Sequence, residues 1–287
     1  MERILVSTDF STRSDRALRR GSLLARQSSA ELVIVHVVDD DQPRRLVEVA
    51  QVEATVFLHE LARTMRELDG ILCESRVVLG DPFQGIIDVA VELGVDLVTL
   101  GSHRRQILRD IFLGTTAERT IRHSVQPVIM ANGIPAGPYR SILIATDFTD
   151  CSIIAAKAAK ELGLLEHTEI TALHVVDPPD LSLVLRASMT MQEIEDRIAE
   201  EEERANTKLE EFIHKVEVVA TRCVVKLVEV STAMAIKNCA QGAQADLVIV
   251  GTRRRTGIEK WLLGSVAESV LSSSDVDVLV VPSGTSA

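Results

Sequence analysis

The chain has few aromatic residues and contains no long apolar run. Aromatic residues make up 3% of the 287 residues, with one Trp and one Tyr, so the core must be aliphatic. No stretch of about 18 consecutive apolar residues occurs, which argues against a membrane-spanning helix. The N-terminal sequence MERILVSTDF also lacks the apolar segment of a signal peptide. We therefore expect a cytoplasmic protein with no membrane partner.

Residues that hold metals or form disulfides are scarce and badly spaced for either role. The four cysteines show no CxxC pair, and the seven histidines show no HxxxH or HExxH spacing. We expect free thiols in a reducing compartment and no metal cluster. A net charge of −11 argues against a nucleic-acid partner, because such a protein needs a basic surface. Local basic loops could still bind small anions.

The second half of the chain repeats the first. Residues 2–10 (ERILVSTDF) match 140–148 (RSILIATDF), and two HVVD segments lie at the same offset of 138, since 147 − 9 and 177 − 39 agree. The segments VDLVTLGS and ADLVIVGT are 150 apart (251 − 101). This indicates a tandem duplication with domains at 1–132 and 139–287, joined by a short turn-rich linker. We expect the extra residues of the second copy to lengthen its helix over 189–215.

Each copy alternates short apolar runs with helical segments, which is typical of a doubly wound sheet. We expect a Rossmann-like α/β domain with five parallel strands in each copy. In the first copy the predicted strands are Arg3–Ser7, Leu32–Val38, Glu74–Leu79, Leu97–Leu100 and Pro127–Met130, and the helices are Ser11–Gln27, Leu46–Leu68, Phe83–Leu93 and one ending near Arg122. The acidic helix of the second copy is either a docking surface or a solvated face, with Ile194, Ile198, Leu209 and Phe212 inward.

Two matching loops could hold an anion. Gly101 and Gly114 are 13 residues apart, as are Gly251 and Gly264, and each pair flanks a basic loop. The helix that follows offers free N–H groups and the positive end of its dipole, to which hydroxyls of Thr115, Thr116 and Ser265 could contribute. A second interpretation stays open, because Thr115-x-x-Glu118 and Ser265-x-x-Glu268 both fit a capping box.

The carboxyl ends of the first strands point to the same crevice as these loops. Asp9 and Asp147 follow the first strand of each copy, where ligands of open parallel sheets bind. Each could accept hydrogen bonds from a ribose or adenine, or could cap the turn that follows. Gly80 after the third strand either makes room for a ligand or forms an ordinary turn, and the second copy has Val230 there.

Together these motifs resemble the universal stress protein family in its tandem two-domain form. The resemblance covers both halves and implies an adenine nucleotide alpha-hydrolase-like fold that binds ATP or AMP at a loop reading G-x2-G-x9-G-S/T. It implies that the nucleotide contacts are Asp9, Val38, Gly80, Gly101, Gly114 and Thr115 in the first copy, and Asp147, Val176, Gly251, Gly264 and Ser265 in the second.

The chain departs from the family pattern at the middle glycine. Arg104 and Arg254 stand there, and an Arg fork can itself hold a phosphate in two hydrogen bonds. We expect altered or weakened nucleotide binding, and the first copy is favoured because it keeps Gly80. The resemblance also implies that the fifth strands pair, which would make a pseudo-dimer within one chain; further homodimerisation stays open.

Three functions remain open. The first is a stress-response regulator that binds adenine nucleotide and is not an enzyme. The second is a scaffold that has lost nucleotide binding. The third is a slow ATPase, although the chain has no G-x-S-x-G elbow and no GxxxxGK[ST] loop.

Overall fold

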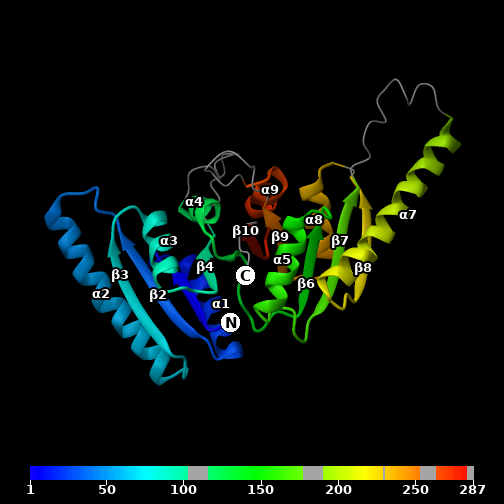
Figure 1. Cartoon of the computed structure of the whole chain (residues 1–287). Helices are drawn as coiled ribbons and strands as arrows, with labels where there is room; N and C mark the ends of the chain where they lie inside the picture. The colour runs from blue at the N-terminus through cyan, green and yellow to red at the C-terminus, as the bar shows by residue number, and fades with distance from the viewer. Residues whose placement is uncertain (103–115, 177–189, 229, 253–262, 283–287) are drawn as a thin grey trace.

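A computed structural model describes residues 1–102, 116–176, 190–228, 230–252 and 263–282. Over these residues the chain forms one ten-stranded sheet with the order β3-β2-β1-β4-β5-β10-β9-β6-β7-β8 (Figure 1). All strand pairs are parallel except β5 with β10. Each half therefore has the doubly wound five-stranded topology that the sequence predicts.

The elements alternate as strand and helix in both halves. The first half contains β1 (Arg3–Ser7), α1 (Ser14–Ser28), β2 (Glu31–Val38), α2 (Arg44–Glu67), β3 (Cys73–Leu79), α3 (Pro82–Glu92), β4 (Leu97–Gly101), α4 (Thr116–His123) and β5 (Val128–Ala131). The second half contains β6 (Ser141–Thr146), α5 (Asp150–Glu161), β7 (Glu169–Val176), α7 (Met191–Val216), β8 (Arg222–Leu227), α8 (Thr232–Gly242), β9 (Leu247–Thr252), α9 (Ser265–Ser273) and β10 (Asp277–Pro282).

The extra length of the second half lies mainly ahead of its long helix, which corrects the expectation from sequence. Helix α7 has 26 residues and α2 has 24, so the helices differ little. The connection from strand to helix runs from Val176 to Met191, against Val38 to Arg44 in the first half. Much of this connection, residues 177–189, lies outside the described residues.

The two halves of α7 have different surroundings. Its C-terminal half packs on the sheet through Ala205, Leu209, Phe212 and Val216, which are buried. Its N-terminal half extends past the end of the sheet (Figure 1), so Ile194 and Ile198 are only half-buried. The inward direction was therefore predicted correctly for Leu209 and Phe212, and only in part for the two isoleucines.

The core forms two aliphatic layers, one on each face of the sheet. Along β1, Ile4 and Val6 face the layer beneath α1, α2, α5 and α7, whereas Leu5 faces the layer beneath α3, α4, α8 and α9. All three are fully buried. A strand buried on both faces needs apolar residues at every position, and this is why the strands read as continuous apolar runs.

The halves join through their fifth strands, as the sequence predicts. Val278 lies opposite Met130, Leu279 opposite Ile129, and Val280 opposite Val128, in antiparallel register. The pairing makes the two five-stranded units one continuous sheet and leaves β3 and β8 as its outer strands.

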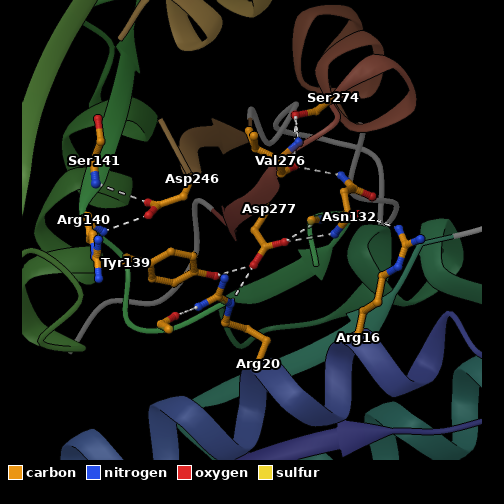
Figure 2. A network of polar contacts seen from close by, with 12 residues as sticks. Arg16, Arg20, Asn132, Tyr139, Arg140, Ser141, Asp246, Ser274, Val276 and Asp277 are labelled. Carbon is orange, nitrogen blue, oxygen red and sulfur yellow. Dashed lines mark hydrogen bonds and ion pairs between the residues drawn. The ribbon is translucent and has the colours of Figure 1, made fainter. Parts of the chain in front are cut away.

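A buried polar network fixes one side of this junction (Figure 2). Arg20 of α1 donates from Nε to Asp277 Oδ2 at 2.7 Å, and both side chains are almost fully buried. Tyr139 Oη donates to the same oxygen at 2.8 Å, and its ring lies 3.9 Å from the guanidinium carbon. The backbone N–H groups of Asn132 and Gly133 donate to Oδ1 at 3.0 Å. The buried carboxylate thus has four donors from both halves and the linker.

The opposite side of the junction lacks this network. At the offsets of the repeat, Ala158 corresponds to Arg20, Pro127 to Asp277 and Met1 to Tyr139. These residues instead line an open groove of about 420 Å³. The pseudo-twofold symmetry of the backbone is therefore broken by side chains, because the described residues at the position related to Arg20, Tyr139 and Asp277 by the repeat carry no such network.

Candidate functional site

Each half has a pocket at the carboxyl ends of its central strands. The first lies at β1 and β4, the second at β6 and β9, and their volumes are about 210 Å³ and 330 Å³. In both halves the strand order reverses at this point, because the chain builds outward in both directions from the first strand. Ligands of open parallel sheets bind at such a crevice.

A pair of hydroxyls closes the floor of each pocket. Thr8 Oγ1 and Ser14 Oγ are 3.0 Å apart, and Thr146 Oγ1 and Ser152 Oγ are 2.9 Å apart. All four side chains are buried. Each pair ties the end of the first strand to the first turn of the next helix, and so fixes the width of the crevice there.

In each half, a Phe ring packs against a His ring at the turn that follows the first strand. Phe10 and Phe148 have φ of 60° and 62°, which is rare for a residue with a bulky side chain. Their rings lie 4.3 and 4.1 Å from the rings of His36 and His174, measured between centroids. Each His ring nitrogen also bonds the carbonyl of the buried Thr at 2.8 Å. Burial lowers the pKa of His174, although the bond to Thr146 opposes this.

The two aspartates line the pockets and also hold the turn. Asp9 Oδ1 accepts from Ser11 N at 3.0 Å, and Asp147 Oδ1 accepts from Thr149 N at 3.1 Å. Helix α1 begins only at Ser14, because Ser11 is held in this turn. Burial alone would raise the pKa of Asp9, but hydrogen bonds with Ser11 and Ser14 and the nearby Arg13 charge outweigh it and lower the pKa. Asp9 therefore stays ionised and keeps an exposed face.

Close packing explains why positions 101 and 251 are glycine, and this explanation involves no ligand. A Cβ at Gly101 would lie 2.7 Å from Arg13 O, and one at Gly251 would lie 2.4 Å from Cys151 O. The start of the first helix of each half therefore packs directly against the end of the fourth strand. Both glycines line the pockets.

The start of α9 opens onto the second pocket. Gly264 occupies the N-cap position, makes no side-chain cap, and is followed by Ser265 as the first helical residue. The sequence-based prediction of a capping box at Ser265 and Glu268 is therefore wrong. Glu268 Oε2 instead lies 3.2 Å from Nη2 of Arg122 in the other half. Among the described residues no side chain caps this first turn, and residues 264–267 line the pocket and present the positive end of the helix dipole.

Comparison with known proteins identifies the family. The model of the universal stress protein family matches residues 1–132 and 138–282. The chain belongs to the universal stress protein family. The match covers both halves, so this is the tandem form.

Individual universal stress proteins agree with this result. One from Mycobacterium tuberculosis is 27% identical over 299 residues, which cover 96% of each chain. One from Methanocaldococcus jannaschii is 34% identical over 144 residues, which cover 50% of this chain and 82% of that protein. The crystal structure of one from Archaeoglobus fulgidus has a TM-score of 0.70 with 21% identity and covers 98% of both chains. The last likeness shows the shared fold.

The two universal stress protein domains differ at the mouth of the pocket. Arg13 lines the first pocket, and its Nη2 lies 3.7 Å from Asp9 Oδ2. At the corresponding place, 138 residues later, the second pocket has the smaller Cys151. Thr116, at the start of α4, lines the first pocket.

Several residues that the family pattern assigns to the site lie beside the pockets. Val38 and Val176 are 5% and 7% exposed and line neither pocket, whereas the preceding Val37 and Val175 do. Gly80 has φ of +133°, a conformation that favours glycine, and lies outside the lining of the first pocket. Val230 is 80% exposed and lines a different pocket.

The centres of both basic loops fall beyond the described part of the chain. Arg104, Gly114, Thr115 and Arg254 are among these residues, so their predicted roles remain predictions. Among the residues that the structure describes, no cluster of three or more His, Cys, Asp and Glu is arranged to hold a metal. Over the same residues, every helix is too short or too polar to cross a membrane.

Proposed function

We propose that this protein is a cytoplasmic stress-response regulator that binds an adenine nucleotide without turning it over. The observation that carries the proposal is the pair of pockets at the strand ends, one of which receives the uncapped start of a helix. Family membership adds support, because the resemblance to the family implies ATP or AMP at this place.

The chemistry of the second pocket fits a nucleotide. The N–H groups at the start of α9 suit phosphate oxygens, since they carry partial positive charge and have no intrahelical acceptor. Asp147 lines the same pocket, and its carboxylate suits the hydroxyls of a ribose or the amine of adenine. Leu173 and Val175 add apolar surface to the lining of this pocket.

The geometry favours the second copy as the stronger site. Cys151 lines the second pocket at the position where the longer, charged Arg13 lines the first, and this leaves more room for a ligand in the second pocket. The sequence alone favoured the first copy on the strength of Gly80, which does not line the first pocket. We therefore propose that one nucleotide binds more tightly at the second copy than at the first.

Isothermal titration calorimetry with ATP, ADP and AMP tests the proposal. We expect heat for at least one nucleotide, loss of the stronger phase in Asp147→Asn, and retention of that phase in the matched Asp9→Asn. No heat and no thermal shift at millimolar nucleotide would instead support the scaffold function. Release of ADP or AMP over hours would contradict the part of the proposal that excludes turnover.

A further inference from the structure

We propose that a second site, between β8 and α8, binds an elongated organic acid with an apolar body. This site is a pocket of about 410 Å³ on the outer strand of the second half. The nucleotide pocket of the same half lies at the ends of β6 and β9 and has a different lining. The two ligands would therefore bind independently.

The pocket exists because α8 does not cover the outer strand. Val225 of β8 packs with the layer beneath α7, whereas Val224 packs with the layer beneath α8. Alternate residues of a strand share a face, so Arg222 and Lys226 lie on the α8 side together with Val224. All three line the pocket. The α8 face of β8 is thus left open to a ligand.

The floor of the pocket is apolar. Val224 and Leu227 contribute from β8, and Met234, Ala235 and Cys239 contribute from α8. Met234 is 44% exposed, so much of this apolar side chain is in contact with water at the pocket. Its thioether is flexible and suits contact with ligands of varied shape. Covering this floor with an apolar body would remove the exposed apolar surface from water.

Two cations stand at the ends of this floor. Arg222 and Lys226 are exposed and form no ion pair with another described residue. Four residues of strand span about 13 Å, so the two cations bracket the apolar floor instead of sharing one anion. An apolar chain with a carboxylate at each end could pair with both cations, whereas a chain with one carboxylate could pair with only one of them.

The corresponding face of the first copy has the opposite character. The outer strands pair with their neighbours in the same register, which places Glu74 at the position of Arg222. Glu74 Oε1 pairs there with Nε of Arg76 at 2.7 Å. On the facing helix, Gln84 Nε2 donates to Asp88 Oδ1 at 2.8 Å. On this face of the first copy the polar side chains pair with one another, so the first copy serves as an internal control for binding of the acid.

The cysteines give each pocket its own reporter. Cys239 lines the proposed site and Cys151 lines the nucleotide pocket, and both are half-buried. Cys223 is exposed and lines neither pocket. Alkylation of each thiol, followed by mass spectrometry with and without ligand, therefore separates the two sites. Burial raises the pKa of Cys239 and Cys223, so rates are compared for the same thiol only.

The test uses decanedioate, decanoate and decanol on the whole protein. We expect protection of Cys239 to fall in that order, with affinity dropping roughly three- to fivefold for each carboxylate removed. Cys151 and Cys223 should react at unchanged rates. Equal protection by all three compounds would overturn the proposal, because binding would then need no charge. Protection of Cys151 by the acids would also overturn it.

Matched variants check the role of the cations. The double variant Arg222→Gln/Lys226→Gln replaces two surface residues. Its affinity for decanedioate should be no higher than the affinity of the original chain for decanol. The control Arg76→Gln, on the same face of the first copy, should bind decanedioate normally. A normal thermal melt of each variant shows that the fold is kept. Unchanged decanedioate affinity in the double variant would contradict the proposal.

Discussion

Removal of Asp277 should destabilise the protein more than removal of its partner Arg20. The carboxylate of Asp277 accepts from Arg20, Tyr139 and the backbone N–H groups of Asn132 and Gly133. Asp277→Ala leaves all four donors without an acceptor and leaves a cation buried. Loss of one partner of a buried ion pair costs about 3–5 kcal/mol.

Arg20→Met should cost less, because the buried carboxylate keeps three of its donors. Hydrogen bonds to a charged group are worth about 1.5–3 kcal/mol each, so the remaining three compensate much of the burial. We therefore expect a cost of about 1–3 kcal/mol for Arg20→Met. The ordering of the two variants, with Asp277→Ala the less stable, follows from the contacts of the carboxylate.

Urea unfolding followed by circular dichroism measures both variants. Glu48→Ala is the control, since its pairing with Arg44 is exposed and should be worth less than about 1 kcal/mol. A cost for Arg20→Met equal to or above that for Asp277→Ala would refute the reasoning. So would a cost for Asp277→Ala as small as that of the surface control.

Three further predictions concern the linker and the pockets. Burial and the neighbouring Asp277 raise the pKa of Tyr139, so the protein should lose stability as the pH rises above about 10, and Tyr139→Phe should reduce that loss. Gly251→Ala should lower the free energy of unfolding by about 1–3 kcal/mol, because the added Cβ would lie 2.4 Å from a backbone oxygen. Gly264→Ala should change it little, because no atom lies within 4 Å of the added Cβ. Thermal melts of the two variants make the comparison. Arg13→Cys should strengthen nucleotide binding at the first pocket about tenfold, and Cys151→Arg should weaken it at the second about tenfold, both measured by calorimetry. Weaker binding in the first variant or stronger binding in the second would contradict the steric account.

The fold follows from features that the sequence displays directly. The strands are buried on both faces, so they read as apolar runs, and the repeat locates their counterparts in the second half. The pairing of the fifth strands was predicted from the family resemblance and is confirmed. The place of the extra length was missed, because the charged run suggested a longer helix and hid the longer connection before it.

The site could be predicted only in part, because the motifs do not show which side chains contact one another at the strand ends. The spacing located Asp9, Asp147, Gly101 and Gly251 at the pockets. The buried Thr–Ser pairs and the Phe–His stacks were missed, although each of these residues recurs in both copies.

The capping box at Ser265 and Glu268 is wrong because Gly264 occupies the N-cap, whereas the box at Thr115 and Glu118 starts at a residue outside the described part of the chain. A local pattern cannot show that Arg122 of the other half attracts Glu268. That contact needs the junction of the two halves, which places α4 beside α9 (Figure 1).

The most direct test of nucleotide binding is a titration of the protein with ATP, followed by the backbone amide resonances of α9. The account predicts large, saturable shifts at Ser265, Val266 and Ala267, because their N–H groups would meet the phosphates. Amides along α8 should change little. Unchanged resonances at these three residues, at ATP concentrations up to several millimolar, would contradict the central claim.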